Sequence, residues 1–301
     1  MPSIIKALIN HHSLPHQFEF WVDQYFRPLA QDIVQRKNNA KQAYVLGIQG
    51  AQGSGKSTAA EFLKLLLEKE HNVSCAVLSI DDFYFTRNER LNLASSIHPL
   101  LETRGVPGTH DIPLAMKVMG ELKDQKAHEN THIPRFNKAA DDRHNPELWG
   151  DITGKVDVII FEGWCVGLPP QDKAALSTPC NDLEKNEDTN LFWRSYVNNQ
   201  LAEGYQTLFS IIDDLLVLQA PSFDVVYEWR LLQEQKLINS LQAKGSLHKG
   251  SRILGNKKVK RFISHYQRLT EHALTCLPSR ARWVLYQNSQ HHFTKMVTST
   301  Q

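Results

Sequence analysis

Eight consecutive residues have the types and the spacing of a phosphate-binding loop. They match the pattern G-x-x-x-x-G-K-[ST] in full and read Gly50-Ala51-Gln52-Gly53-Ser54-Gly55-Lys56-Ser57. Glycines let the backbone curl, so that successive N–H groups and the N-terminus of the next helix face phosphate oxygens. Lys56 would then reach the β and γ phosphates of a nucleotide, and Ser57 would hold Mg²⁺. We predict that this loop, together with Thr58, binds a nucleotide with Mg²⁺.

Carboxylates follow two of the apolar runs in the chain. Asp81 and Asp82 come after the run at 75–80, and Glu162 comes after the run at 157–161. Ligands bind at the carboxyl edge of a parallel sheet, so a carboxylate there can take a proton from a substrate hydroxyl or contact Mg²⁺. Asp81 is our candidate for the proton acceptor and Glu162 for the Mg²⁺ contact. Asp81 and Asp82 also suit helix N-caps, and Glu162 also suits a surface residue that happens to end a strand.

The elements that must position these residues form an alternating pattern. Short, continuous apolar runs are typical of strands that are buried on both faces, and helical patterns lie between them. This order predicts an α/β fold with a five-stranded, mainly parallel sheet covered by helices, of the P-loop NTPase kind. The expected strands are 44–48, 75–80, 156–161, 215–218 and 283–286.

The remaining segments suggest an extension, two long loops and an insertion. Apolar residues at helical spacing predict a helical N-terminal extension over 1–40, interrupted by Pro15 and Pro28, before a main domain over 41–301. The segments 86–113 and 131–150 are rich in Pro, Gly, His, Arg and Asp, and we expect irregular functional loops there. We read 167–190 as a polar, mobile insertion.

Composition argues against a disordered, collagen-like or coiled-coil protein. The chain has 301 residues, of which 41% are hydrophobic and 22% charged, which is ordinary for a globular protein. Its 34 basic and 32 acidic residues leave a net charge of +2, too little to indicate binding to nucleic acid or to membranes through bulk charge. The four cysteines form no C-x-x-C pair, and there is neither an export signal nor a long apolar stretch. We expect a cytoplasmic protein whose partner is a small molecule; the oligomeric state stays open.

The phosphate-binding loop, the Asp-x-Phe at 81–83 and the Glu-Gly at 162–163 together resemble the P-loop small-molecule kinases that include uridine kinase, phosphoribulokinase and pantothenate kinase. Within that group the chain is similar to the D-glycerate 3-kinases and their bacterial and fungal kinase-like relatives, from about Tyr44 to about Tyr286. The blocks that carry this resemblance are Leu78–Tyr84, Arg104–Asp111, Ile133–Lys138, Glu162–Gly167 and Trp229–Glu234.

The resemblance implies roles for the residues that match its motifs. Asp81 takes the role of base, Lys56 and Ser57 those of phosphate and Mg²⁺ ligands, and Glu162 that of the acid on the Mg²⁺ side. Arg230 corresponds to a lid arginine that stabilises charge in the transition state, with a surface ion pair as the alternative. The basic segment 244–261 is either a flap over the ATP phosphates or a solvated run of charge.

The loops supply candidate groups for the substrate. A small carboxylate needs cationic donors, and Arg binds a carboxylate best because it can hold both oxygens. Solvated loop charges are the alternative for each cation. The candidates are Arg104, His110, Arg135 and Lys138, with Tyr84 beside Asp81.

We therefore predict an enzyme that transfers the γ-phosphoryl of ATP, with Mg²⁺, to a hydroxyl of a small hydroxy acid, D-glycerate being the first choice. A kinase of another small alcohol, such as uridine or pantothenate, is the alternative. A regulatory GTPase is disfavoured because the Asn-Lys-x-Asp box that reads guanine is missing. A nucleotide-binding assembly factor is disfavoured by Asp81 and Glu162 but stays open.

Overall fold

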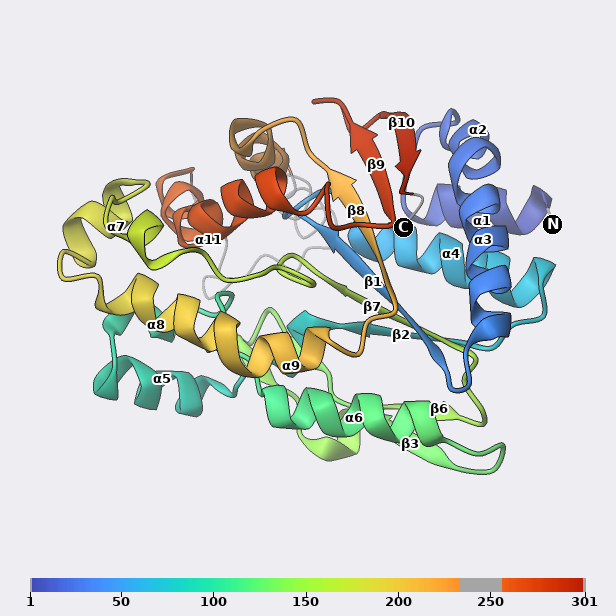
Figure 1. Ribbon diagram of the computed structural model, residues 1–301, viewed down its shortest axis with the longest axis horizontal. Coiled ribbons are helices and arrows are strands. Elements are labelled where there is room, and N and C mark those ends of the chain that lie inside the picture. Colours follow the sequence, from blue (N-terminus) through green and yellow to red (C-terminus); the bar gives the residue numbers. More distant parts are fainter. Residues whose placement is uncertain (1, 233–255, 300–301) are drawn as a thin grey trace, which may run out of the picture.

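The main β-sheet has six strands in the order β10-β9-β8-β1-β7-β2. Figure 1 shows the computed structural model, which describes residues 2–232 and 256–299. Four of the five strand pairings are parallel, and at one edge β10 pairs antiparallel with β9. The strands are β1 Tyr44–Gly50, β2 Cys75–Ser79, β7 Val158–Gly163, β8 Asp214–Gln219, β9 Trp283–Gln287 and β10 Phe293–Thr298.

The prediction of a parallel sheet is confirmed, but the prediction of five strands is wrong by one. Each expected strand exists within a few residues of its expected bounds, and these five are parallel to one another. The sixth strand is β10, whose residues after Phe293 are exposed or only half-buried. An edge strand of this kind has no continuous apolar run, and its sequence therefore gives a weak signal.

The two faces of the sheet are covered by different helices. Side chains alternate along each strand, so Leu46 and Ile48 of β1 point into one apolar cluster and Val45 into the other. The first cluster contains the N-terminal helices and α4 (Lys56–Glu70), and the second contains the helices that follow β2 and β7. Burial on both sides explains why the central strands read as continuous apolar runs.

The N-terminal segment is helical, as predicted, and packs on the first face. Its helices are α1 Pro2–His11, α2 Phe18–Trp21 and α3 Arg27–Asn39. Pro15 lies in the break after α1, as we expected. Pro28 does not break the helical segment, so our expectation for this residue is wrong. The residues Val22–Phe26 form a π-helical turn, and Pro28 stands in the first turn of α3, where its missing N–H is tolerated.

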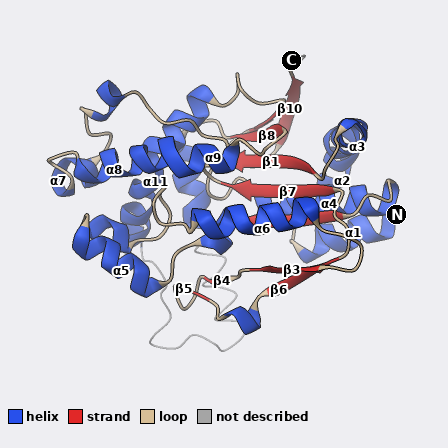
Figure 2. Cartoon of the chain, turned by 60° about the horizontal axis from the view of Figure 1, so that its bottom comes forward, coloured by secondary structure: helices blue, strands red, loops and turns tan. Residues whose placement is uncertain are grey.

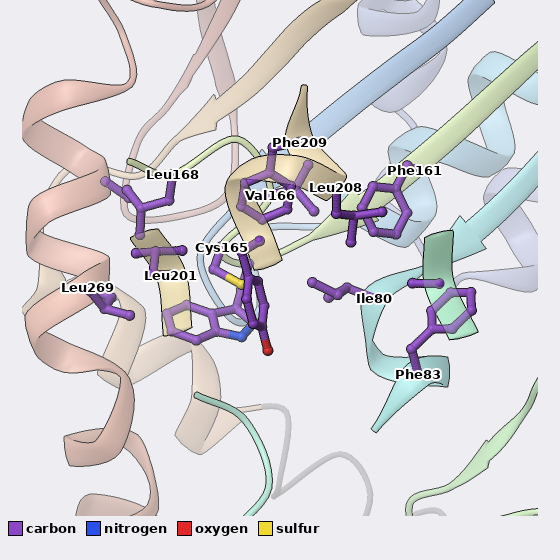
Figure 3. Packing of buried hydrophobic residues seen from close by; sticks show 14 of the residues in the cluster. Ile80, Phe83, Phe161, Cys165, Val166, Leu168, Leu201, Leu208, Phe209 and Leu269 are labelled. Carbon is purple, nitrogen blue, oxygen red and sulfur yellow. The ribbon is translucent and has the colours of Figure 1, made fainter. Parts of the chain in front are cut away.

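The helices of the second face bury the other side of the strands. They are α6 Ile112–Asp124, α8 Phe192–Gln200, α9 Gln206–Phe209 and α11 Asn256–Cys276. Figure 3 shows Leu208 and Phe209 of α9 beside Phe161 of β7, with Val166 from the segment that follows β7. This packing fixes the segment after β7 close to the carboxyl edge of the sheet.

The two segments expected to be irregular contain short regular elements. The first holds α5 (Arg87–Ser96), which begins with a capping box formed by Thr86 and Glu89. The second holds two small antiparallel pairs that Figure 2 places apart from the main sheet. They are β3 Asn130–Ile133 with β6 Gly150–Thr153, and β4 Phe136–Asn137 with β5 Asp142–Arg143.

The segment 167–190 is tied to the fold at its acidic end, which contains α7 (Asp182–Glu187). Arg268 of α11 contacts buried Glu184 with N and O 2.6 Å apart, and Arg194 of α8 contacts buried Asp188 at 2.8 Å. Both arginines also donate to backbone carbonyls of the segment. The acidic residues therefore anchor this segment to two helices.

Candidate active site

The phosphate-binding loop lies between β1 and α4, as the sequence predicts. Gly53 and Gly55 have φ angles of 79° and 87°, in the left-handed region that favours glycine. A Cβ on Gly53 would also lie 3.0 Å from Cβ of Trp229, so the loop passes close to the helix at 223–232. The loop thus takes the curled form that presents backbone N–H groups and a helix N-terminus to an anion.

Lys56 is the cation of this loop. Its ammonium donates to the backbone carbonyl of Ala51 over 3.1 Å. Burial lowers the pKa of Lys56, while the charges of Glu162 and Asp81 act in the opposite direction. The lysine is therefore a partly desolvated cation beside two carboxylates, and phosphate oxygens would compensate its burial.

Glu162 and Ser57 form an oxygen pair beside Lys56. The register of the sheet sets Glu162 of β7 between Ile48 of β1 and Ser79 of β2. Its carboxylate accepts a hydrogen bond from the Ser57 hydroxyl at 2.8 Å, and burial raises its pKa. Oxygen donors of this kind suit Mg²⁺, which usually takes one or two protein carboxylates together with phosphate oxygens and water.

Among residues 2–232 and 256–299 there is no group of three or more His, Cys, Asp or Glu side chains arranged to hold a metal ion. Ser57 and Glu162 would suit a Mg²⁺ ion that is carried by a nucleotide, because such an ion takes only one or two protein ligands.

Asp81 lies just past β2, in a 3₁₀ turn at Ile80–Phe83 that is capped by the side chain of Ser79. One carboxylate oxygen accepts from the Lys138 ammonium at 2.7 Å, and the other accepts from the Tyr84 hydroxyl at 3.0 Å. Burial alone would raise the pKa of Asp81, but the charges of Lys138 and Lys56 hold it well below its usual range. Asp81 is therefore ionised at neutral pH, which is the state that a proton acceptor needs.

Asp82 has a different environment from its neighbour. It accepts from the Arg135 guanidinium at 2.9 Å and from the backbone N–H of Phe136 at 3.1 Å. Asp82 does not cap a regular α-helix, and it takes no part in the contacts of Asp81 with Lys138 and Tyr84. Asp82 anchors the loop that carries Lys138, which explains why two adjacent carboxylates occur at this position.

His110 packs against Tyr84, the residue that donates to Asp81. Its ring stacks on Tyr84 with the centroids 4.3 Å apart, and its Nδ1 lies 2.6 Å from the hydroxyl of Tyr205. Burial lowers the pKa of His110 to about 3. The imidazole is therefore neutral at physiological pH and does not supply the positive charge that we considered for it from the sequence.

Comparisons with known proteins agree with this geometry. A family model described as "KAP family P-loop domain" matches residues 23–227, more than half of the chain. The uncharacterized kinase mug58 of Schizosaccharomyces pombe is 36% identical over 231 residues, which cover 74% of this chain and 78% of that protein. The chain belongs to this P-loop family, and its relatives are kinases.

Two further matches concern one activity. The chloroplastic D-glycerate 3-kinase of Arabidopsis thaliana is 31% identical over 229 residues, which cover 74% of the kinase described here and 46% of that longer protein. The structure of a D-glycerate 3-kinase from Cryptococcus neoformans superposes with a TM-score of 0.72 and 25% identity, covering 92% of this chain and 98% of that one. The resemblance expected from the sequence is thereby confirmed.

Two of the candidate arginines of the kinase are engaged by neighbouring acids. Arg104 pairs with Asp141 and lies over the ring of Phe136 at 5.3 Å from its centroid. Arg135 is held by Asp82, as described above. The structure therefore brings Lys138 and Tyr84 directly to Asp81 and His110 against Tyr84, whereas Arg104 and Arg135 are paired with other acids.

Arg230 contacts an aromatic ring of α11. Its guanidinium carbon is 5.5 Å from the ring centroid of Phe262 in α11. Arg230 itself lies on the helix at 223–232, next to Trp229, which is close to Gly53. The suggested flap at 244–261 falls mostly outside the described residues, and its last six residues begin α11. The role of Arg230 as a lid residue stays a prediction.

Two residues of the site were not identified from the sequence. Tyr205 holds His110 and Gly108 through its hydroxyl, and Asp141 holds both Arg104 and the buried Arg90. Tyr205 lies in a helical segment 95 residues after His110, and no local pattern links the two. Asp141 has a φ of 59°, which is typical of Asp or Asn in a tight turn but does not indicate a partner.

In the described part of the chain, no helix is both long and apolar enough to span a membrane.

Proposed function

We propose that this chain is an ATP-dependent kinase that transfers the γ-phosphoryl of ATP to a hydroxyl of a small hydroxy acid, with D-glycerate giving 3-phosphoglycerate. The observation that carries the proposal is the placement of an ionised Asp81 beside Lys56 and Glu162 at one edge of the sheet. A phosphate site and a proton acceptor side by side are the two parts that transfer to an alcohol requires.

Each residue has a role in this reaction. The loop 50–58 binds the phosphates, and Lys56 stabilises the negative charge on the β and γ phosphates. Mg²⁺, when bound, neutralises further charge on these phosphates, and Ser57 with Glu162 would hold it. Asp81 accepts the proton of the attacking hydroxyl, so that the hydroxyl oxygen can bond to the γ-phosphorus while ADP leaves.

The acceptor class follows from the groups around Asp81. The Lys138 side chain is 63% exposed, so its ammonium can reach a substrate carboxylate while it remains near Asp81. Arg104 and Arg135 lie in the same loop region, each in an ion pair with an aspartate. This arrangement favours a small anion over a neutral nucleoside, and the similarity to two D-glycerate 3-kinases supports glycerate as that anion.

The test is a panel of acceptors. Purified protein is incubated with Mg²⁺-ATP and D-glycerate, L-glycerate, uridine or pantothenate, and ADP formation and phosphorylated products are measured. We expect turnover with D-glycerate well above that with the others. Turnover with uridine or pantothenate but not with D-glycerate would overturn the proposed substrate and would still support a kinase. ATP binding without any acceptor-dependent turnover would favour a nucleotide-binding assembly factor.

A further inference from the structure

His110 carries a polar atom for which the fold provides no partner. The residue is only 2% exposed, and its Nε2 is buried without a hydrogen bond to any residue that the structure describes. Buried polar groups are nearly always hydrogen-bonded, because an unpaired one costs free energy. A substrate that binds at Asp81 would supply a partner for this atom.

The hydrogen bonds of Tyr205 indicate which ring nitrogen of His110 carries the proton. The Tyr205 oxygen accepts from the backbone N–H of Gly108 at 3.0 Å and lies 2.6 Å from Nδ1 of His110. Among the described residues, the Tyr205 hydroxyl has no acceptor other than that Nδ1. Tyr205 is fully buried, so its hydroxyl proton must go to Nδ1, and the proton of the neutral imidazole then lies on Nε2.

The ring of His110 is linked to Asp81 through Tyr84. His110 and Tyr84 face each other in an antiparallel bridge, and their rings stack with an angle of 23° between them. Tyr84 in turn donates to Asp81. The charge of Asp81 also acts on the pKa of His110, in the direction opposite to burial.

We propose that the Nε2–H of His110 donates a hydrogen bond to a second, non-reacting hydroxyl of the acceptor, and that Tyr205 is a positioning residue that keeps the proton on Nε2. This inference rests on the proposed function. A neutral donor suits a hydroxyl, whereas the carboxylate of the same substrate has the ammonium of Lys138. For D-glycerate phosphorylated at C3, the bound group is the hydroxyl at C2.

His110→Phe tests the donor, because Phe keeps a flat ring against Tyr84 and removes both ring nitrogens. KM and kcat are measured for D-glycerate and for 3-hydroxypropionate, which lacks the C2 hydroxyl. We expect KM for D-glycerate to rise by about 10- to 100-fold with little change in kcat, because the bond is made equally in the ground state and the transition state. KM for 3-hydroxypropionate should change by less than about threefold.

His265→Phe is the matched control. His265 is also buried with an unpartnered Nε2 among the described residues, but it lies on α11 against Trp193 and away from Asp81. It should leave both KM values unchanged. Equal losses for the two acceptors in His110→Phe, or an unchanged KM for D-glycerate, would overturn the proposal.

The tautomer has its own test, which needs no activity. In protein labelled with ¹⁵N-histidine, the two ring nitrogens of His110 have distinct NMR shifts for N–H and for bare nitrogen, and the His110→Phe spectrum assigns them. We expect the proton on Nε2 in the wild type and a mixture of tautomers in Tyr205→Phe. Tyr196→Phe, which alters another tyrosine beside Gly108, should match the wild type.

The outcomes separate the two claims. A wild-type protein without turnover on D-glycerate contradicts the proposed substrate, and the His110→Phe comparison is then made with the acceptor that the panel identifies and its deoxy analogue. A proton on Nδ1 in the wild type, or a Tyr205→Phe spectrum identical to the wild type, overturns the role given to Tyr205. A KM increase in Tyr205→Phe with kcat retained supports it.

Discussion

At the scale of single residues, adjacent carboxylates have separate tasks because different cations hold them. Asp81 faces Lys138 and Lys56, and Asp82 faces Arg135 and a backbone N–H. From the sequence we favoured Asp81 as the base, with a helix cap as the alternative, because Asp after a strand suits both roles. The contacts that separate these roles come from loop residues more than 50 positions away.

Asp81→Asn keeps the size of the side chain and removes its ability to accept a proton. We expect kcat to fall by at least about 10²-fold with ATP affinity unchanged, since this is the usual effect of removing a general base. Asp82→Asn is the control, and it should lower kcat less while it weakens the loop at 135–136. Steady-state kinetics and ATP titration measure both variants. A larger loss of kcat in Asp82→Asn would show that Asp82 is the base.

At the scale of elements, most strands could be predicted and several short elements could not. Central strands have continuous apolar runs, whereas β10 is mostly exposed and β3 to β6 are two to four residues long. One missed element did leave a signal: Thr86 and Glu89 form a capping box that marks the start of α5. The π turn before Pro28 has no local sequence signal that we recognised, and its Phe26 packs against Phe62 of α4.

The N-terminal helices belong to the core of the first face. Phe26 is fully buried and lies with its ring centroid 6.1 Å from that of Phe62 in α4, whereas Phe20 on the same segment is 58% exposed. We expect Phe26→Ala to lower the free energy of unfolding by about 3 to 5 kcal/mol. Phe20→Ala should change it by less than about 0.5 kcal/mol. Urea denaturation compares the two, and equal small effects would mean that these helices are not part of the cooperative unit.

At the scale of the whole molecule, two buried histidines link stability to pH. Burial lowers the pKa of His110 to about 3 and of His265 to about 4, whereas an unfolded histidine titrates near 6.5. Below about pH 6.5 the unfolded chain therefore binds more protons than the folded one. The free energy of unfolding should fall as the pH drops from about 6.5 to 4. Above about pH 6.5 both histidines are neutral in the folded and unfolded chains, and their full contribution to stability is present.

His265→Phe isolates one of these groups without touching the active site. Between about pH 6 and 4.5 the slope of the free energy of unfolding against pH should decrease by up to about 1.4 kcal/mol per pH unit relative to the wild type. Urea denaturation at several pH values measures the slope, and the exposed His128 replaced by Gln serves as a control for the loss of any histidine. Parallel curves for His265→Phe and the wild type would show that His265 is protonated in the folded protein.

The central claim for the molecule is that the loop 50–58 drives phosphoryl transfer to an alcohol held at Asp81. The most direct measurement follows radioactive phosphate from γ-labelled ATP into D-glycerate with the wild type and with Lys56→Ala. Lys56 supplies the main positive charge on the β and γ phosphates. We expect labelled 3-phosphoglycerate from the wild type and none from Lys56→Ala, with weaker ATP binding by the variant. Equal transfer by the two proteins would contradict the central claim.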